Sequence, residues 1–370
     1  MKVLMIPTWY SAHDAEVMTA GVFHYEQSIA LKKYADMALY YPYDMGLDAG
    51  FYMAEEKGLL TFRRGRRLSF LRPIFFILDF MRIRKHFKPD IIHGHVGAGA
   101  GVPAVLLGKL FRTPVVITEH SPIEQMGFDK PSRVRFVKRI YKGSKANVCV
   151  STHSMNSLQE YFPEEKFQVI YNGVIDPQTI EKNQKKYAVD GHVNCCIVAA
   201  FYDKDIKGYQ YLIPAIKKIV EAGMKITLHI CGGGDYLEYY QNMAKKLEIE
   251  GNCIFYGTCD RNKVYSIIEQ MDFSISSSVF ESAGVSVQEA MLLGKPLVVT
   301  KSGGANSLVT EETAIAVDRE SVDALVEGIT EMSQKLSEFD EKKIRAYAFE
   351  NFEIDQVSQK YMELYSSLMK

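Results

Sequence analysis

The sequence predicts an α/β protein built from two successive doubly wound units, each with a parallel sheet. Three observations support this fold class. The chain has 370 residues, which is too many for one ordinary core, so two domains are expected. Short apolar runs alternate with helical patterns, as in parallel sheets with crossover helices. A polar stretch without apolar periodicity, from residue 172 to about residue 191, separates the two halves.

The front half contains five predicted strands. They are apolar runs of a length typical of buried strands, at residues 3–6, 37–41, 91–93, 115–118 and 147–150. Helical patterns between them predict helices over 22–33 and 74–86. Ligands of such sheets bind at the carboxyl ends of the strands, so the loops that follow these runs are the first place to look for a site.

The rear half repeats this arrangement. Strands are predicted at 194–199, 226–230, 253–256, 273–276 and 297–299, and helices at 211–222, 236–247, 261–270 and 321–336. A final helix over 354–370 has an apolar face with a 3.6-residue period, made by Val357, Tyr361, Leu364, Tyr365 and Leu368.

Composition is that of a globular, water-soluble protein, with 47% hydrophobic and 24% charged residues. The net charge is −1, but residues 1–170 hold 23 Lys and Arg against 16 Asp and Glu, so the front half is basic and the rear half acidic.

None of the six cysteines forms a C-x-x-C pair, which predicts buried free thiols in a reducing compartment. The first residues read as a strand and not as a signal peptide, and no apolar run approaches the roughly 20 residues of a membrane span. We therefore expect a cytoplasmic protein.

The most informative segment is 280–296, where Glu281 and Glu289 stand eight positions apart. A helix is predicted from about Val285 to Gly294, because Gly caps helix ends in the left-handed conformation and Pro296 blocks continuation. The backbone N–H groups of the turn Ser282-Ala283-Gly284-Val285 would then face a phosphate or a polar sugar. Glu281 could reach sugar hydroxyls, and Glu289 could accept both hydroxyls of a ribose. A capped surface helix with solvated glutamates is the alternative.

Two further loops follow predicted strands. Lys207, beside Gly208, could place its ammonium on a diphosphate and stabilise a departing nucleotide. Asp203 and Asp205 also form a D-x-D, a pattern that could hold a divalent metal against a diphosphate. A solvated charged turn is the alternative for both patterns, and it explains the two aspartates better than it explains Lys207.

Glycines mark two other candidate phosphate loops. Gly21 opens a predicted helix and lets backbone approach a phosphate, although an ordinary turn glycine has the same appearance. Gly233 lies in Cys-Gly-Gly-Gly-Asp after a strand; this is a fragment of a dinucleotide-binding loop without its full register, and a tight strand-to-helix turn accounts for it better.

Histidines end two strands of the front half. His120 follows Glu119 and could donate to a sugar hydroxyl or to a departing phosphate oxygen. His93 and His95 read equally well as packed loop histidines, since metal ligation requires partners that the sequence does not reveal.

The segment 62–88 carries nine Arg and Lys residues interleaved with aromatic and aliphatic ones. A basic, aromatic helix predicts contact with an anionic membrane surface. Nucleic-acid binding and a solvated helix with its apolar side in the core are the rival interpretations.

Together these residues resemble glycosyltransferase family 4, the group 1 glycosyl transferases. Its E-x7-E hallmark matches Glu281…Glu289 within the run from Ser276 to Gly284. Other matches follow one another along the whole chain, at 21–23, 118–120, 171–174, 207–208, 255–257, 294–300, 303–304 and 352–365. Their order and spacing carry the resemblance, more than any single motif.

The resemblance implies a GT-B fold, with two Rossmann-like domains facing a cleft. An acceptor-side domain of residues 1–171 is completed by the C-terminal helix 352–370, and residues 172–351 bind the nucleotide sugar. It also implies retaining transfer without a metal or other cofactor, from a UDP-sugar to a glycan or lipid-linked acceptor of a surface polysaccharide. No nucleic-acid partner is expected, and the enzyme is expected to work in the cytoplasm or on the inner face of the membrane.

By the same resemblance, Glu289 holds the ribose, and Glu281 with the amides after it holds the sugar. Lys207 and the Gly21 loop hold the diphosphate, with Gly233 on the donor side, and His120 lies over the sugar. The chain departs from the family at Ala199-Ala200-Phe201, where an Arg is frequent, and Lys204 could replace that charge. It also has Ala305-Asn306-Ser307 where a Glu is frequent. A metal-dependent transferase, a non-catalytic nucleotide-sugar-binding subunit and a GT-B sugar-nucleotide epimerase therefore stay as alternatives.

Overall fold

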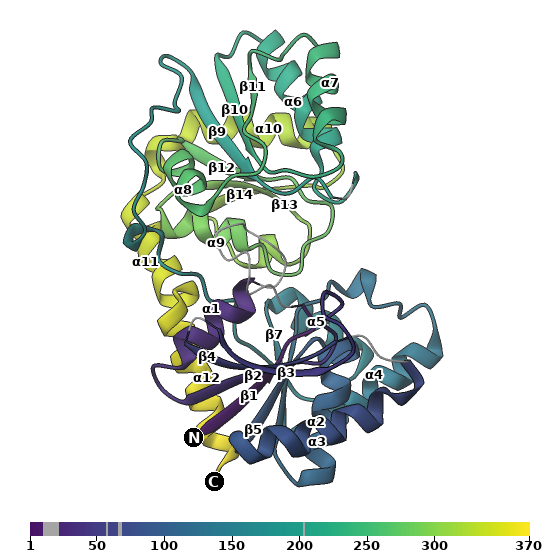
Figure 1. Cartoon of the computed structure of the whole chain (residues 1–370). Coiled ribbons are helices and arrows are strands. Elements are labelled where there is room, and N and C mark those ends of the chain that lie inside the picture. Colours follow the sequence, from purple (N-terminus) through teal and green to yellow (C-terminus); the bar gives the residue numbers. More distant parts are fainter. Residues whose placement is uncertain (10–21, 57, 66–68, 203) are drawn as a thin grey trace. The chain divides into compact units, whose positions relative to one another are not determined.

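A computed structural model of the chain describes all residues except 10–21, 57, 66–68 and 203. The chain divides into two compact units, each described here by itself. Of the described residues, the front unit contains those up to Gly173 together with Ile354–Lys370, and the rear unit contains Val174–Glu353. In Figure 1 the front unit runs from purple to teal and ends in the yellow C-terminal helix.

The front unit is built on an eight-stranded sheet in the order β3-β4-β2-β1-β5-β6-β7-β8. All of its pairs are parallel except the β3–β4 hairpin. The strands are β1 (Lys2–Ile6), β2 (Asp36–Tyr41), β3 (Phe51–Glu56), β4 (Leu59–Arg64), β5 (Ile91–His95), β6 (Val115–Glu119), β7 (Ala146–Cys149) and β8 (Phe167–Val169).

Helices cover both faces of this sheet. They are α1 (Val22–Leu31), α2 (Arg72–His86), α3 (Gly101–Phe111), α4 (Pro131–Gly143), α5 (Thr152–Tyr161) and α12 (Ile354–Leu368). Successive residues of a strand point to opposite faces. Accordingly Leu4 and Ile6 of β1 pack in a core with α2 and α3, whereas Val3 and Met5 pack with α1 and α12. The predicted apolar face of the last helix is confirmed, because Val357, Tyr361 and Tyr365 are buried in that second core.

The rear unit has a six-stranded, fully parallel sheet in the order β11-β10-β9-β12-β13-β14. Its strands are β9 (Val193–Val198), β10 (Ile226–Cys231), β11 (Cys253–Phe255), β12 (Phe273–Ser276), β13 (Leu297–Thr300) and β14 (Ala314–Val317). This is the strand order of a Rossmann-type sheet. Its helices are α6 (Tyr209–Glu221), α7 (Leu237–Lys246), α8 (Arg261–Glu269), α9 (Val285–Leu292), α10 (Val322–Lys335) and α11 (Glu341–Phe352).

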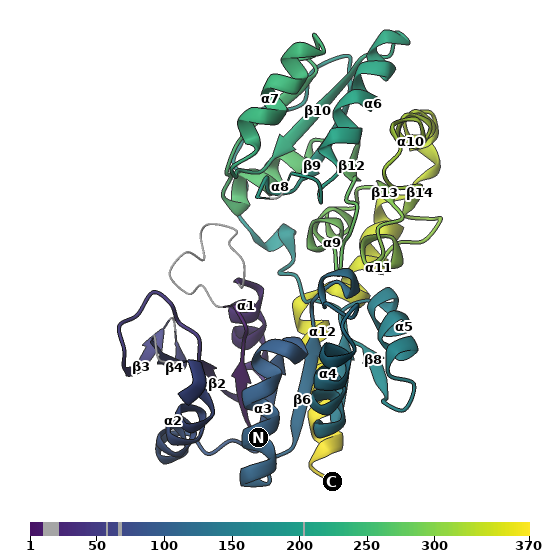
Figure 2. The same cartoon turned by 90° about the vertical axis from the view of Figure 1, so that its right-hand side faces the viewer.

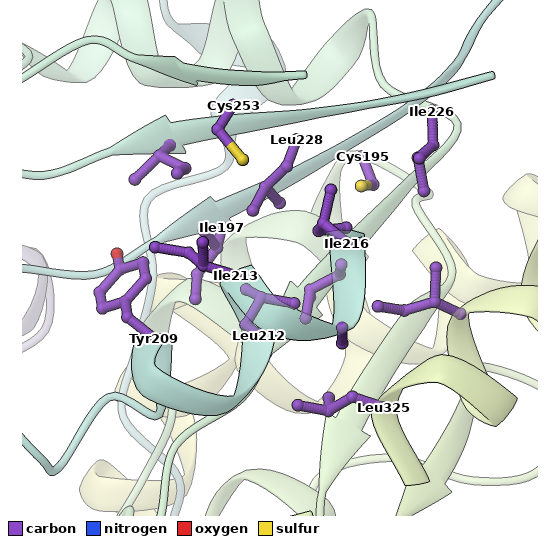
Figure 3. Packing of buried hydrophobic residues seen from close by; sticks show 14 of the residues in the cluster. Cys195, Ile197, Tyr209, Leu212, Ile213, Ile216, Ile226, Leu228, Cys253 and Leu325 are labelled. Carbon is purple, nitrogen blue, oxygen red and sulfur yellow. The ribbon is translucent and has the colours of Figure 1, made fainter. Parts of the chain in front are cut away.

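A compact core joins the rear sheet to α6. Figure 3 shows Leu212 and Ile216 of this helix facing Leu228 and Cys195 of neighbouring strands, and all four are fully buried. The helix α10 lies beside β13 and β14, where its Leu325, Ile329 and Met332 extend the same core (Figure 2). The six cysteines are buried and free, as predicted.

The predicted strands are all observed, but the structure has further strands that were not predicted. Each of the ten predicted strands is present. Four observed strands were not predicted: the edge strands β3, β8 and β14, and the inner strand β4. The expectation of a basic helix across 62–88 is wrong at its start: Phe62 lies in β4, and the helix α2 begins at Arg72. None of the helices in the described part of the chain is both long and apolar enough to span a bilayer.

Candidate active site

The rear sheet reverses its strand order between β9 and β12. These two strands are parallel neighbours, with Ser274 paired to Cys196. At such a switch point the loops after the two strands run in opposite directions and leave a crevice at the carboxyl edge. The loop after β9 carries Lys207, and the loop after β12 carries Glu281.

Backbone contacts fix these two loops to one another. The Val279 amide donates to the Ile206 carbonyl at 2.7 Å, and the Ser277 hydroxyl donates to the Lys207 carbonyl at 2.8 Å. Gly208 has φ of 72°, and a Cβ there would lie 1.8 Å from the Ser277 carbonyl oxygen. Glycine therefore permits both the left-handed turn and the close approach of the loops.

The contact places the two predicted side chains together. Lys207 Nζ lies 2.8 Å from Glu281 Oε2, and the side chains are 30% and 19% exposed. Burial raises the pKa of Glu281, but the Lys207 charge and hydrogen bonds from Lys207 and from the Gly284 and Ser282 amides outweigh it, so the pKa is lowered overall. Glu281 is thus held as a carboxylate.

The turn after Glu281 forms around its backbone. The Glu281 amide donates to the Ser302 carbonyl at 3.0 Å, and the Gly304 amide donates to the Glu281 carbonyl at 2.6 Å. Gly284, with φ of 71°, caps the start of α9, which begins at Val285 as predicted. At the other end of that helix, Gly294 has the predicted left-handed conformation, with φ of 79°. Ala283 is buried in the turn.

Glu289 lies on α9 and is 1% exposed. Its Oε1 accepts a hydrogen bond of 2.9 Å from the hydroxyl of Tyr265 on α8. The alternative of solvated glutamates is therefore wrong for Glu289, whose carboxylate is buried. Sequence patterns gave no sign of Tyr265, because α8 and α9 meet only in the folded sheet.

The other predicted donor-side residues lie in nearby loops of the rear unit. Lys204 is exposed, and its ammonium lies 4.5 Å from the centre of the Tyr239 ring. Gly233 packs closely against the loop after β11, because a Cβ there would lie 2.0 Å from the Thr258 hydroxyl oxygen. Sequence analysis missed Arg319, whose guanidinium donates to the Val279 carbonyl at 3.1 Å and lies over the Phe280 ring.

Two sequence candidates lie outside the described residues, namely Gly21 and Asp203. The D-x-D pattern is consequently represented by Asp205 alone, which is exposed.

His120 belongs to the front unit, where it follows β6 at the carboxyl edge of the sheet. Its Nε2 is 2.8 Å from Nδ1 of His95, which ends β5. Burial lowers the pKa of His120 to about 3, so the imidazole is neutral at physiological pH. The neighbouring Glu119 accepts hydrogen bonds from the His120 and Ser121 amides and from the Tyr141 hydroxyl, which holds this loop in place.

Comparison with protein families agrees with this architecture. The profile of the group 1 glycosyl transferases matches residues 179–348, and that of glycosyltransferase family 4 matches residues 50–176. The chain belongs to glycosyltransferase family 4. Both Glu281 and Glu289 fall within the group 1 match, as does Lys207, whereas His120 falls within the other.

Curated relatives are glycosyltransferases or proteins of unassigned function. A 41.2 kDa uncharacterized protein in the cps region of Klebsiella pneumoniae is 27% identical, over 96% of this chain and 99% of its own length. The alpha-monoglucosyldiacylglycerol synthase of Streptococcus pneumoniae is 23% identical, over 63% of this chain, and the match spans 56% of that enzyme.

Solved structures share the fold over nearly the whole chain. Sucrose-phosphate synthase from Thermosynechococcus elongatus has a TM-score of 0.81 at 16% identity, covering 100% of this chain and 99% of that one. HepE from Anabaena, in complex with UDP, has a TM-score of 0.79 at 18% identity, covering 99% of this chain and 100% of that one. The family 4 glycosyltransferase therefore has the expected GT-B fold, with two parallel-sheet α/β units.

Proposed function

We propose that this glycosyltransferase moves a sugar from a UDP-sugar to a glycan or lipid-linked acceptor of a surface polysaccharide, with retention of configuration and without a metal. The observation that carries the proposal is the Lys207–Glu281 pair at the switch point of the rear sheet. Three similarities support the finer points. HepE binds UDP and UDP-glucose, the Klebsiella relative lies in a cps region, and the Streptococcus relative is named for a glucosylated lipid.

In this proposal the rear unit holds the donor. Lys207 contacts the diphosphate and neutralises charge that develops as the nucleotide leaves. Glu281, kept ionised by Lys207, accepts hydrogen bonds from sugar hydroxyls, and Glu289 accepts them from the ribose. One Glu289 oxygen already accepts from Tyr265, but a carboxylate oxygen has a second lone pair for a ribose hydroxyl.

The transfer breaks the bond between the sugar and the phosphate oxygen and forms one to the acceptor hydroxyl on the same face. The departing phosphate takes the hydroxyl proton, so no separate protein base is required. His120, neutral because it is buried, donates a hydrogen bond to the sugar or to the phosphate oxygen. Lys204 and the Gly233 and Gly21 loops are proposed as secondary contacts to the diphosphate.

Incubating the purified protein with a panel of nucleotide sugars and acceptors tests the proposal. Nucleotide release, the anomeric configuration of the product by NMR, and turnover in EDTA are measured. We expect UDP release, retention and full turnover in EDTA. Turnover that needs a divalent metal would favour the Asp205 alternative, isomerised donor without acceptor would favour an epimerase, and donor binding without any turnover would favour a binding subunit.

We also propose that the front unit contacts an anionic membrane surface through α2. Ile74, Leu78 and Met81 form an exposed apolar stripe at helical spacing, preceded by Phe70, which is 74% exposed. Basic residues on the same helix or just after it are exposed: Arg72, Arg82, Lys85 and Lys88. An apolar stripe flanked by basic side chains complements anionic lipid.

Two arginines that precede α2 are engaged in ion pairs within the front unit. Arg64 is buried and bonded to Asp79, and Arg63 is paired with Glu56 and Asp44, so neither faces a membrane. Arg66 and Arg67 lie outside the described residues.

Co-sedimentation with vesicles tests this contact. A variant with Ile74, Leu78 and Met81 changed to Ser should lose binding to phosphatidylserine vesicles, whereas Leu110→Ser, which changes an exposed leucine on α3, should bind as the wild type does. Equal binding by the triple variant and the wild type would remove α2 from the proposal, and equal binding to neutral vesicles would remove the role of charge.

A further inference from the structure

Three histidines from separate parts of the sequence meet at the carboxyl edge of the front sheet. His24 lies in the first turn of α1, His95 ends β5, and His120 follows β6. The centre of the His24 ring lies 4.5 Å from the centre of the His95 ring and 5.2 Å from that of the His120 ring, and both pairs meet edge-on. The His95 and His120 rings are stacked, with their centres 5.1 Å apart. All three rings are buried.

The ring nitrogens of this cluster are short of partners. Both nitrogens of His24, Nε2 of His95 and Nδ1 of His120 are buried without a hydrogen-bond partner among the residues that the structure describes. His93, also buried nearby, is different: its Nδ1 is 2.6 Å from the Tyr365 hydroxyl and its Nε2 is 2.8 Å from the Thr118 hydroxyl. Burying a polar atom without a hydrogen-bond partner is unfavourable, so four such nitrogens in one cluster call for an occupant.

The charge state suits a cation. Burial, with smaller contributions from the neighbouring imidazoles, lowers the pKa of His24 and of His95, and burial lowers that of His120 to about 3. A neutral imidazole is the form that binds metals. The Glu119 carboxylate already accepts hydrogen bonds from the Gly97 amide and the Tyr141 hydroxyl. The imidazole nitrogens are therefore the atoms of the cluster that can serve as metal ligands.

We propose that His24, His95 and His120 bind a divalent transition metal of the zinc class. One nitrogen from each ring can be chosen so that all three lie within 4.8 Å of one another. Because zinc binds imidazole at about 2.0–2.1 Å, small ring rotations would bring them into a tetrahedral arrangement. Three nitrogen ligands leave a fourth position for water or for a substrate oxygen.

This inference does not rest on the proposed function. The transfer is proposed to run without a metal, and the cluster forms within the front unit alone. The two connect only through His120, since a metal would occupy one of its ring nitrogens.

Protein without a histidine tag, stripped with chelator, provides the test. Titration with Co²⁺ should give one equivalent of a visible ligand-field band, and calorimetry with Zn²⁺ should give one site per chain. His24→Gln, which changes no residue placed in the transfer machinery, should weaken Zn²⁺ binding by at least about 10–100-fold. His153→Gln, on α5 of the same unit, is the matched control and should bind as the wild type does.

Two results would overturn the proposal: absence of a Co²⁺ band in the wild type, or wild-type affinity in His24→Gln. If His24→Gln does not fold, X-ray absorption of the zinc-loaded wild type decides the question alone. Imidazole nitrogen ligands would support the site, whereas sulfur or oxygen ligands only would refute it, because the chain also carries six cysteines.

Discussion

The ammonium nitrogen of Lys207 lies 2.8 Å from a carboxylate oxygen of Glu281, although 74 positions separate the two residues. They meet because β9 and β12 are neighbours at the point where the rear sheet reverses its strand order. The contacts of Lys207 and Gly208 with Ser277 hold the backbone of the lysine against the loop after β12. A cation and an ionised carboxylate are thus prepared side by side before any substrate arrives.

Lys207→Met should lower kcat for nucleotide release by about 10²–10³-fold, if its charge stabilises the leaving diphosphate. Its effect on stability should be small, about 0–1 kcal/mol, because the pair is partly exposed. Steady-state kinetics and thermal unfolding measure the two effects. Lys218→Met, which removes an exposed lysine paired with Asp323, is the control and should change neither. Near-normal turnover in Lys207→Met would remove the lysine from the mechanism.

The site was predictable where one local segment carries it. Glu281, Gly284 and Gly294 act within a single turn–helix unit, and their roles in the backbone follow from residue type and spacing. The strands were predictable because a buried parallel strand is apolar along its whole length. In contrast, β3 at the sheet edge has only partly buried and exposed residues and no such signal.

Contacts between distant segments were not predictable in this way. His24 meets His95 and His120 only because α1 begins at the sheet edge where β5 and β6 end. Tyr265 meets Glu289 only because α8 and α9 pack together. The one available signal was that two histidines end neighbouring strands, at His95 and His120. The burial of Arg64 was hidden as well, since a run of basic residues does not distinguish the one that pairs with Asp79.

Tyr265→Phe should raise KM for the nucleotide sugar and change kcat less. The tyrosine hydroxyl donates to Glu289 Oε1, so its loss lets the carboxylate turn and weakens its hold on a ribose. The change removes one oxygen, and the ring stays in place to fill the core. Kinetics with the donor varied at saturating acceptor separate the two constants. A fall in kcat with unchanged KM would show that Tyr265 does not act through donor binding.

Asp79→Asn should destabilise the front unit by about 3–5 kcal/mol, because it leaves the Arg64 guanidinium buried without its counter-charge. The side chains of Arg64 and Asp79 are 5% and 0% exposed, and Tyr40 also donates to Asp79 at 2.8 Å. Denaturant unfolding measures the loss. Asp323→Asn breaks an exposed pair and should cost less than about 1 kcal/mol. Replacing Arg64 and Asp79 together by Met and Leu should recover part of the stability.

Mild acid should destabilise the front unit through its buried histidines. Burial lowers the pKa of His93 and His120 to about 3, and those of His24 and His95 are also lowered. Below the ordinary pKa of about 6.5 the unfolded chain takes up protons that the folded chain refuses, so stability falls as pH drops from that value toward 3. Each such proton contributes a slope of about 1.4 kcal/mol per pH unit.

The denaturant unfolding free energy at pH 7.5, 6.0 and 5.0 measures that slope. His24→Gln should reduce the slope by the contribution of one proton, about 1.4 kcal/mol per pH unit. His86→Gln, at an exposed position, should leave the slope unchanged. A slope in His24→Gln equal to that of the wild type would mean that His24 is charged, or solvated, in the folded chain.

Gly208→Ala should separate the geometry of the Lys207 loop from the chemistry of Lys207. Gly208 and Gly223 both have positive φ, of 72° and 91°, so alanine costs backbone strain of about 1–2 kcal/mol at either position. Only at Gly208 would the new Cβ also strike a neighbour, the Ser277 carbonyl oxygen, whereas the Cβ at Gly223 meets nothing within 4 Å. The clash pushes the loop away from Ser277 and carries Lys207 away from Glu281.

Turnover should therefore fall in Gly208→Ala but not in Gly223→Ala at matched folded fractions, as measured by nucleotide release and circular dichroism. Equal turnover in the two variants would mean that the 2.8 Å contact is not required in the reaction, even if the lysine charge is.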